Sequence, residues 1–321
     1  MSASLSAGKD VRVSPVSAHA EAFVAAHRSA AAALGRRLAR ELTDPTIFVP
    51  VLGAGLRKLA DPAYRDAQAW MVPGAVGVVG VRWPLVQAVE RALRHPLAHS
   101  SAAVALSLAD ALSRDARFEV RLFAHVMLRR SLPDDPERSW QIMRRLARAA
   151  SDWVSVDALA GLVARGLLLE PFRWAEIELL VYSPHRWERR LAGSTLAELP
   201  HHLPSASRPA LASRPGLPII GALIGDDDHD VQKALAWALR SWRQVDPSGV
   251  VELLRREATV AAETGDGARA WVVRDALTGA GADERLAQEL RPRVAGIRRR
   301  IGASNTSRAH EAMAAFLGGP A

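Results

Sequence analysis

The sequence WVSVDALAGLVARGLLLEPFRWAEIELLVYSPHRWERRLAGSTLAEL, residues 153–199, carries the clearest structural pattern of the chain. Its apolar residues recur at spacings of three and four, the period of an amphipathic helix. The pattern predicts helices over Trp153–Ala164, Pro171–Tyr182 and His185–Leu199. Short links with helix stop-and-start residues, such as Ser183-Pro184, separate them. We therefore expect helices that follow one another with little chain between them.

The same spacing continues over most of the sequence. It predicts helices over Glu21–Leu42, Trp83–Leu93, Ala103–Leu112, Phe118–Leu132, Ser139–Ala150, Asp230–Trp242, Gly249–Thr259, Arg269–Leu277 and Ala282–Ile301. No alternating strand pattern is convincing, and the glycines within Val76–Val81 favour a loop. Helix pairs in series are typical of HEAT or armadillo repeats. The sequence thus predicts an all-α fold, a curved α-solenoid of HEAT-like antiparallel helix pairs, with a compact helical bundle as the alternative.

The predicted domain organisation is simple. Residues 1–17 are small and polar, so we expect a flexible N-terminal tail there. Residues 18–318 are predicted to form a single HEAT-like repeat domain. The repeat period is loose, because a Pro-, Ser- and Arg-rich insertion at residues 201–216 lengthens the interval between Trp187 and Trp237.

Composition narrows the possible functions. The 321 residues include no cysteine, which excludes disulfides, cysteine nucleophiles and cysteine-ligated metal sites. The net charge of +8 favours a polyanionic partner, although an arginine and alanine bias is also typical of GC-rich genomes. The first twenty residues lack the apolar core of a signal peptide, and no apolar run is long enough to span a membrane. We expect a cytoplasmic protein without a membrane segment.

Several catalytic and binding motifs are missing from the sequence. It contains no GxxxxGK[ST] phosphate loop, no GxSxG elbow and no HExxH pair, and Gly74, Gly77 and Gly80 are spaced GxxGxxG. The acidic run at residues 226–230 is compatible with a metal site, but acids at the start of a helix also favour its positive end. We adopt the second interpretation and expect no metal and no cofactor.

Trp153 and Asp157 form the first candidate constellation. They are four residues apart, so they lie on the same helical face, one turn apart. An aromatic ring beside a carboxylate suits a cation, because both attract positive charge. A core position also explains Trp153, whereas a buried carboxylate without a partner is costly. The pair predicts a site that stabilises positive charge.

Arginines crowd the start of the helix at Trp187. Arg186, Arg189 and Arg190 stand there within five residues. One interpretation is a solvated basic face. The other is contact with phosphate groups, which the N-terminus of a helix assists. We predict phosphate contact by Arg189 and Arg190.

A basic and aromatic stripe marks a later helix. Lys233, Trp237 and Arg240 follow one another at spacings of four and three and share one helical face. Leu235 and Leu239 lie on the opposite face, which we assign to the core. The separation predicts that Trp237 is displayed rather than only packed.

The sequence resembles the AlkD-type DNA alkylation repair enzymes, the HEAT-like repeat DNA glycosylases, in four segments that occur in the family's order. The segments resemble the family's Gly-Val-x-x-Pro turn, its Trp-x-x-x-Asp element, its Trp-x-x-Arg-x-Ala helix and its lysine–alanine–tryptophan–arginine helix. They are Gly80–Pro84, Trp153–Asp157, Trp187–Ala192 and Val231–Arg240. Together they extend the resemblance over most of the chain, to about Asp275.

The resemblance implies a role for each matching residue. Trp153 and Trp237 would form two aromatic walls around the sugar of the damaged nucleotide, Asp157 would be the catalytic carboxylate, and Arg190 would hold the DNA backbone. Lys233, Arg240 and Arg274 would be further phosphate contacts. The implied reaction is hydrolysis of the N-glycosidic bond of cationic N3- or N7-alkylated purines in duplex DNA. It would need no base-flipping pocket, and we expect a monomer to perform it.

Three other functions stay open at the level of sequence. The first 80 residues and the insertion at 201–216 are longer than the family pattern requires, which permits a self-resistance glycosylase for bulky natural-product adducts. A non-catalytic protein that binds unusual DNA would have little need for the pair Trp153 and Asp157. A protein scaffold, a common use of HEAT-like repeats, predicts an apolar or acidic inner face.

Overall fold

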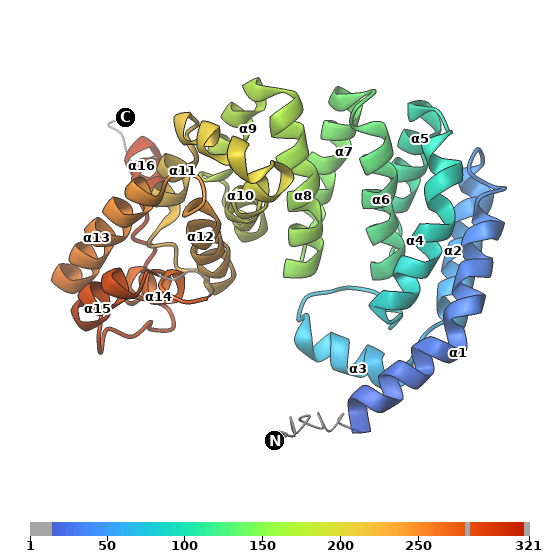
Figure 1. Cartoon of the computed structure of the whole chain (residues 1–321), viewed down its shortest axis with the longest axis horizontal. Helices are drawn as coiled ribbons and strands as arrows, with labels where there is room; N and C mark the ends of the chain where they lie inside the picture. Colours follow the sequence, from blue (N-terminus) through green and yellow to red (C-terminus); the bar gives the residue numbers. More distant parts are fainter. Residues whose placement is uncertain (1–14, 280–282, 318–321) are drawn as a thin grey trace, which may run out of the picture.

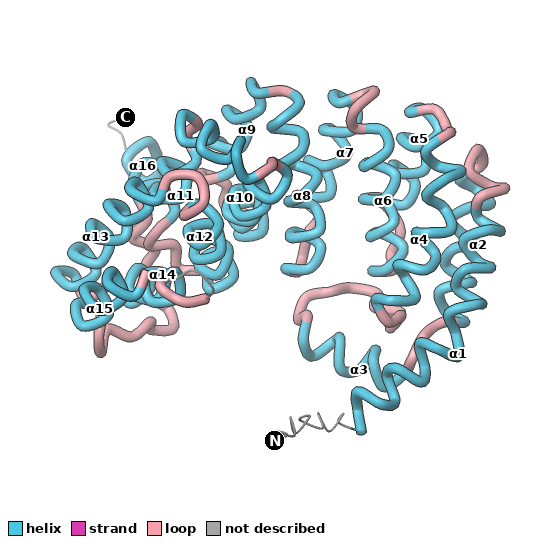
Figure 2. The backbone as a smooth tube through the Cα atoms, viewed as in Figure 1, coloured by secondary structure: helices cyan, strands magenta, loops and turns pink. Residues whose placement is uncertain are grey.

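The computed structural model describes residues 15–279 and 283–317, and within these residues all regular elements are helices (Figure 2). Ala60 and Val81 form an isolated β-bridge. The helices are α1 (Pro15–Leu38), α2 (Pro45–Lys58), α3 (Pro62–Met71), α4 (Trp83–Ala98), α5 (Ala102–Ser113), α6 (Phe118–Ser131), α7 (Pro136–Ala149), α8 (Trp153–Leu169), α9 (Trp174–Leu180), α10 (Arg186–Glu198), α11 (Gly216–Leu223), α12 (His229–Trp242), α13 (Pro247–Thr264), α14 (Gly267–Ala276), α15 (Glu284–Arg293) and α16 (Arg308–Leu317), with the 3-10 helices η1 (Pro171–Arg173), η2 (Leu199–His202) and η3 (Ser205–Ser213).

The helices pack in two layers. In the inner layer α4, α6, α8, α10, α12 and α14 each contact the next helix of the series. In the outer layer α5, α7, α9, α11 and α13 pack on α6, α8, α10, α12 and α14. Figure 1 shows this array bent into an arch, with the inner layer on its concave side and α3 at one foot. The predicted curved α-solenoid of helix pairs is confirmed.

The helix starts follow from local chemistry. Four helices begin with Asp-Pro, in which the aspartate caps the helix and the proline occupies its first turn. Asp152 does the same work without a proline at the start of α8, because its carboxylate accepts hydrogen bonds from the backbone N–H and the hydroxyl of Ser155. Closely spaced caps explain why the connections are short.

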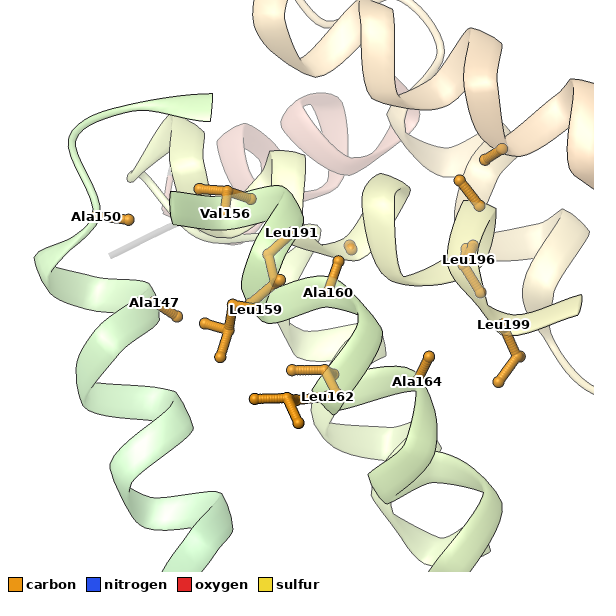
Figure 3. Close-up of a cluster of buried hydrophobic side chains, with 14 of the residues drawn as sticks. Ala147, Ala150, Val156, Leu159, Ala160, Leu162, Ala164, Leu191, Leu196 and Leu199 are labelled. Atoms are coloured by element: carbon orange, nitrogen blue, oxygen red, sulfur yellow. The ribbon is translucent and has the colours of Figure 1, made fainter. Parts of the chain in front are cut away.

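The core lies between the two layers. Figure 3 shows the part at α7, α8 and α10, where Leu159 and Leu162 point from α8 toward α7 and Leu191 of α10 lies beside them. All three side chains are buried. Packing of this kind contributes about 1.5–3 kcal/mol for each fully buried leucine. The leucine and alanine pattern of residues 153–199 therefore fixes how α7, α8 and α10 meet.

Four helices were not predicted from the sequence pattern, namely α2, α3, α11 and α16. Within α2, Pro50 and two glycines interrupt the helical signal, yet the apolar face with Phe48 and Leu52 is fully buried and holds the helix in place. The expected insertion at 201–216 includes the end of η2 and the whole of η3 rather than an open loop. Of the expected tail, residues 1–14 lie outside the described residues, and residues 15–17 belong to α1. No described helix is long and apolar enough to cross a membrane.

The contact between α10 and α12 depends on a glycine. A Cβ at Gly193 would lie 3.0 Å from the Cβ of Ala234 and 3.2 Å from its carbonyl carbon. A Cβ at Gly161 of α8 would lie no closer than 3.7 Å to any neighbour, and those neighbours are the flexible side-chain ends of His202 and Glu198. A larger side chain is therefore tolerated at Gly161 but forces α10 away from α12 at Gly193.

We predict that Gly193→Val lowers the free energy of unfolding by about 1–3 kcal/mol relative to Gly161→Val, because only the first substitution overpacks a helix contact. Urea denaturation followed by circular dichroism measures both variants. Both replace a glycine within a helix by the same residue, so helix propensity cancels. Equal stability of the two variants would contradict the close packing of α10 against α12.

Candidate functional site

Asp157 lies at the seam between α8 and α10, on the inner layer. Its side chain is 22% exposed. Arg190 of α10 donates from Nε to Oδ1 at 3.1 Å and from Nη2 to Oδ2 at 2.7 Å, so the pair is bidentate. The Oγ of Ser194 donates to Oδ1 at 2.7 Å. Three donors therefore fix the plane of a carboxylate that still meets solvent.

Arg190 is buried, and the protein itself uses all three of its guanidinium nitrogens. Only 5% of the residue is exposed, and Nη1 donates to the backbone carbonyl of Asp230 at the start of α12. Three of its five N–H donors are thus used within the protein, and because the side chain is buried, Arg190 orients Asp157 here instead of presenting its charge to solvent. Its expected contact with the DNA backbone remains a prediction.

Ser194 is the member of this group that sequence reasoning missed. It follows Arg190 by four residues and therefore lies on the same face of α10, one turn further along. Its side chain is completely buried, and its hydroxyl is directed at Asp157. The spacing was visible in the sequence. A serine among small residues nevertheless carries no signal until the facing carboxylate is known.

Trp153 is displayed at the first turn of α8. It is 38% exposed, which is high for a tryptophan beside a helix core. Its Nε1–H points to the carbonyl oxygen of Met71, at the end of α3, over 3.4 Å. With Asp157 one turn further along α8, an exposed aromatic ring and a fixed carboxylate share one face, as the spacing of four predicts.

Trp237 is half-buried on α12 and packs against the core. Asp230, Lys233 and Trp237 are spaced at zero, three and seven residues and share one face of α12. Since Arg190 bonds the carbonyl of Asp230, this face begins next to the Arg190–Asp157 pair. Leu235 and Leu239 are fully buried on the opposite face, as predicted. The structure thus brings Asp157 and Arg190 into contact and places the two tryptophans on the helices at either side of α10.

The other predicted phosphate ligands are engaged within the protein to different degrees. Lys233 is half exposed and pairs with Asp230 at 3.2 Å. Arg189 pairs with Asp226 at 2.7 Å and is largely buried. Burial raises the pKa of Asp226, while the hydrogen bond from Arg189 acts in the opposite direction. Arg240 pairs with Asp275, and Arg274 donates to the carbonyls of Val294 and Ile297. Of these four side chains, Lys233 is the most exposed.

Two cations that the sequence did not single out lie on the inner layer. In the part of the chain that the structure describes, Arg129 of α6 is exposed and Arg165 of α8 is partly exposed, and no ion pair or hydrogen bond engages either guanidinium. Burial lowers the pKa of His202, and the charges of Arg165, His201 and Arg129 lower it further. The two arginines thus create positive potential on the same surface. Neither stands beside an aromatic residue, which is why no motif marked them.

The acidic run at residues 226–230 has a structural role. Asp228 caps α12 by accepting hydrogen bonds from the backbone N–H groups of Asp230 and Val231. Asp226 is the buried partner of Arg189. The described residues hold no group of three or more His, Asp or Glu side chains with the geometry of a metal site. The interpretation as a helix start is confirmed by the cap.

Comparison with known protein families adds an independent observation. The family described as DNA alkylation repair enzyme matches residues 52–278 of the chain. This range is more than half of the sequence, and it contains Trp153, Asp157, Arg190, Ser194 and Trp237. No curated protein matches the chain.

We predict that Arg190→Met lowers the free energy of unfolding by about 3–5 kcal/mol, because it leaves Asp157 without its counter-charge inside the seam. The matched control is Arg186→Met on the same helix. Arg186 pairs with Asp228 at 3.1 Å but is half exposed, so its loss should cost no more than about 1 kcal/mol. Thermal unfolding measures both variants, and similar losses in the two would rule out a special structural role for Arg190.

Proposed function

The chain belongs to the DNA alkylation repair enzyme family, and we propose that it is a DNA glycosylase that excises cationic N3- or N7-alkylated purines from duplex DNA. One observation carries the proposal. Arg190 and Ser194 fix the carboxylate of Asp157 at the inner face, one helical turn from the exposed ring of Trp153. A carboxylate held beside an aromatic ring is suited to stabilise a positive charge that develops in a bound substrate.

The leaving group determines what the site has to supply. Alkylation at N3 or N7 gives the purine a positive charge, so the base leaves without being protonated. The C1′–N bond breaks, its electron pair departs with the base and neutralises it, and positive charge develops on the deoxyribose. A water oxygen then bonds C1′ and releases a proton. The enzyme therefore needs a fixed negative charge and a place for water, and it does not need a strong general acid.

The side chains present match these needs. Asp157 lies opposite Arg190 as its ion-pair partner and turns its remaining surface to solvent, where a sugar and a water molecule can approach. Trp153 and Trp237 would add the attraction between aromatic faces and a cationic sugar. Because these groups lie on an open inner face, the proposal needs no extrusion of the base into a closed pocket, in contrast to glycosylases that flip the target base.

Charge on the inner layer favours DNA over a protein partner. A scaffold surface should be apolar or acidic, whereas this layer carries Arg129 and Arg165, which have no ion-pair partner among the described residues, and the half-exposed Lys233. Arginine forks grip phosphate oxygens in pairs. We therefore assign Arg129, Arg165 and Lys233 to the phosphate backbone in the proposed complex.

We predict that Asp157→Asn slows release of 7-methylguanine from duplex DNA by about 100-fold or more, because it removes the negative charge that stabilises the cationic sugar. Single-turnover base release at saturating enzyme measures the effect. Asp110→Asn is the control, because Asp110 also pairs with arginines but lies on the outer helix α5. An unchanged rate in a folded Asp157→Asn variant would remove Asp157 from the mechanism.

We also predict that binding to DNA weakens steeply with salt, because several phosphates are neutralised in the complex. Arg165→Gln and Arg129→Gln should each lower the slope of log K against log salt concentration by about one. Arg255→Gln should leave the slope unchanged, because Arg255 lies on the outer helix α13, where it pairs with Glu289 of α15. Fluorescence anisotropy on a labelled duplex gives the slopes. A flat salt response of the wild-type protein argues against a DNA-binding inner face.

A further inference from the structure

We propose that α3 and the loop that follows it form a rigid lip, residues 62–82, which presents Trp70 to DNA as a third aromatic contact beside Trp153. The inference rests on the proposed function for its partner, duplex DNA. It assigns a binding role to a segment outside α8, α10 and α12 and to the GxxGxxG spacing of Gly74, Gly77 and Gly80.

Glu119 holds the last part of the lip. This glutamate lies in the first turn of α6, and only 1% of it is exposed. Its Oε2 accepts the N–H of Val79 at 2.8 Å, and its Oε1 accepts the N–H groups of Gly80 and Val81 at 2.7 and 3.1 Å. A buried carboxylate is retained when several donors satisfy it. These three bonds therefore fix the lip to the inner layer.

Further bonds tie the middle of the lip to the starts of α6 and α8. Ser151 Oγ donates to the carbonyl of Gly74 at 2.7 Å, and the N–H of Phe118 donates to the carbonyl of Gly77 at 3.0 Å. Arg121 Nη2 donates to the carbonyl of Val76 at 2.9 Å. Because the loop makes this many hydrogen bonds to two helices, we expect it to keep one conformation on the surface.

The glycines permit this close approach. Gly74 and Gly77 have φ values of +99° and +73°, which L side chains rarely adopt. A Cβ at Gly74 would lie 2.2 Å from the carbonyl oxygen of Ser151, and a Cβ at Gly77 would lie 2.1 Å from that of Ala116. The GxxGxxG spacing of Gly74, Gly77 and Gly80 does not match a dinucleotide-binding fingerprint. It does place glycines where the loop packs closely against the starts of two helices.

Trp70 is the exposed feature that this scaffold carries. The residue is 84% exposed, more than Trp83 and Trp153, the other strongly exposed tryptophans of the described chain. It lies two residues after the buried Gln68, and therefore on the opposite side of α3 from the packed face. Trp70 and its exposed neighbour Met71 together present apolar surface to water, and exposed apolar patches mark binding surfaces.

The lip is continuous with the candidate site through Trp153. The indole N–H of Trp153 points to the carbonyl of Met71, the residue after Trp70. Met71 and Val76 of the lip are also exposed, so apolar surface extends from Trp153 outward along the lip. Figure 1 shows α3 at the foot of the arch, beneath the inner helices. A duplex with one nucleotide bound at Asp157 and Trp153 would therefore place the neighbouring part of the same groove against the lip.

DNA is the partner that fits this placement. Proteins that bind the minor groove of duplex DNA often insert an apolar side chain between two bases, which it partly unstacks. A third ring on the Trp153 side would grip the DNA beyond the damaged nucleotide. The role assigned to Trp70 is therefore binding and positioning, with no part in breaking the glycosidic bond.

The test measures affinity for a duplex without a lesion, at fixed salt. Trp70→Ala should weaken binding about ten-fold, Trp70→Phe should restore most of the affinity, and Phe172→Ala should have no effect. Phe172 is the control because it is 65% exposed but lies in η1, next to the outer helix α9. Wild-type affinity in Trp70→Ala would overturn the proposal.

A second readout reports stacking directly. DNA should quench more tryptophan emission in the wild-type protein than in Trp70→Phe, and equal quenching would overturn the proposal. The outcomes for Trp70 and for the glycosylase are separable, because this assay needs no chemistry. Weaker binding in Trp70→Ala combined with undiminished base release in Asp157→Asn keeps the lip and removes the glycosylase mechanism. The reverse pair of results removes the lip alone.

Discussion

The ion pair between Arg190 and Asp157 is the interaction on which the inner face depends. A buried guanidinium needs a partner for each of its nitrogens, and Arg190 finds them on α8 and at the start of α12. One side chain of α10 therefore locks three successive inner helices in register. Breaking such a pair leaves an uncompensated charge in the protein, so the geometry of Asp157 and the stability of the seam cannot vary independently. Gly193 serves the same seam by letting α10 approach α12 closely.

This constraint divides the arginines into two groups. The first group donates hydrogen bonds to carboxylates and carbonyls within the chain and consists of Arg189, Arg190, Arg240 and Arg274. Arg129 and Arg165 have no ion pair or hydrogen bond of this kind with any described residue, so they are available to solvent or a ligand. Net positive charge therefore overstates how much of the surface is available to an anion. The chain is a member of the DNA alkylation repair enzyme family. The substrate proposed for it is an anion along its backbone and a cation at the lesion, and the exposed cations and the fixed carboxylate on the same layer match these two charges.

The lip, on the N-terminal side of the site, also depends on polar contacts with the inner helices. Its conformation is set by hydrogen bonds to Glu119 and Ser151 rather than by an apolar core of its own. Such an element is rigid only while α6 and α8 hold their positions. The display of Trp70 is thus a consequence of how the inner helices start, in the same way that the orientation of Asp157 is a consequence of how α10 sits between its neighbours.

The sequence by itself determined the helical repeats, the curved two-layer architecture and the placement of Trp153 and Asp157 on one face, because each of these rests on spacings of three or four residues. It also placed Leu235 and Leu239 in the core. Only the tertiary structure decided what the charged residues do. Arg190 and Asp157 are 33 residues apart, and Ser194 is 37 residues from the same carboxylate. Periodicity shows which side of a helix a residue occupies. Whether an arginine on that side meets a carboxylate or open solvent depends on which helix packs against it.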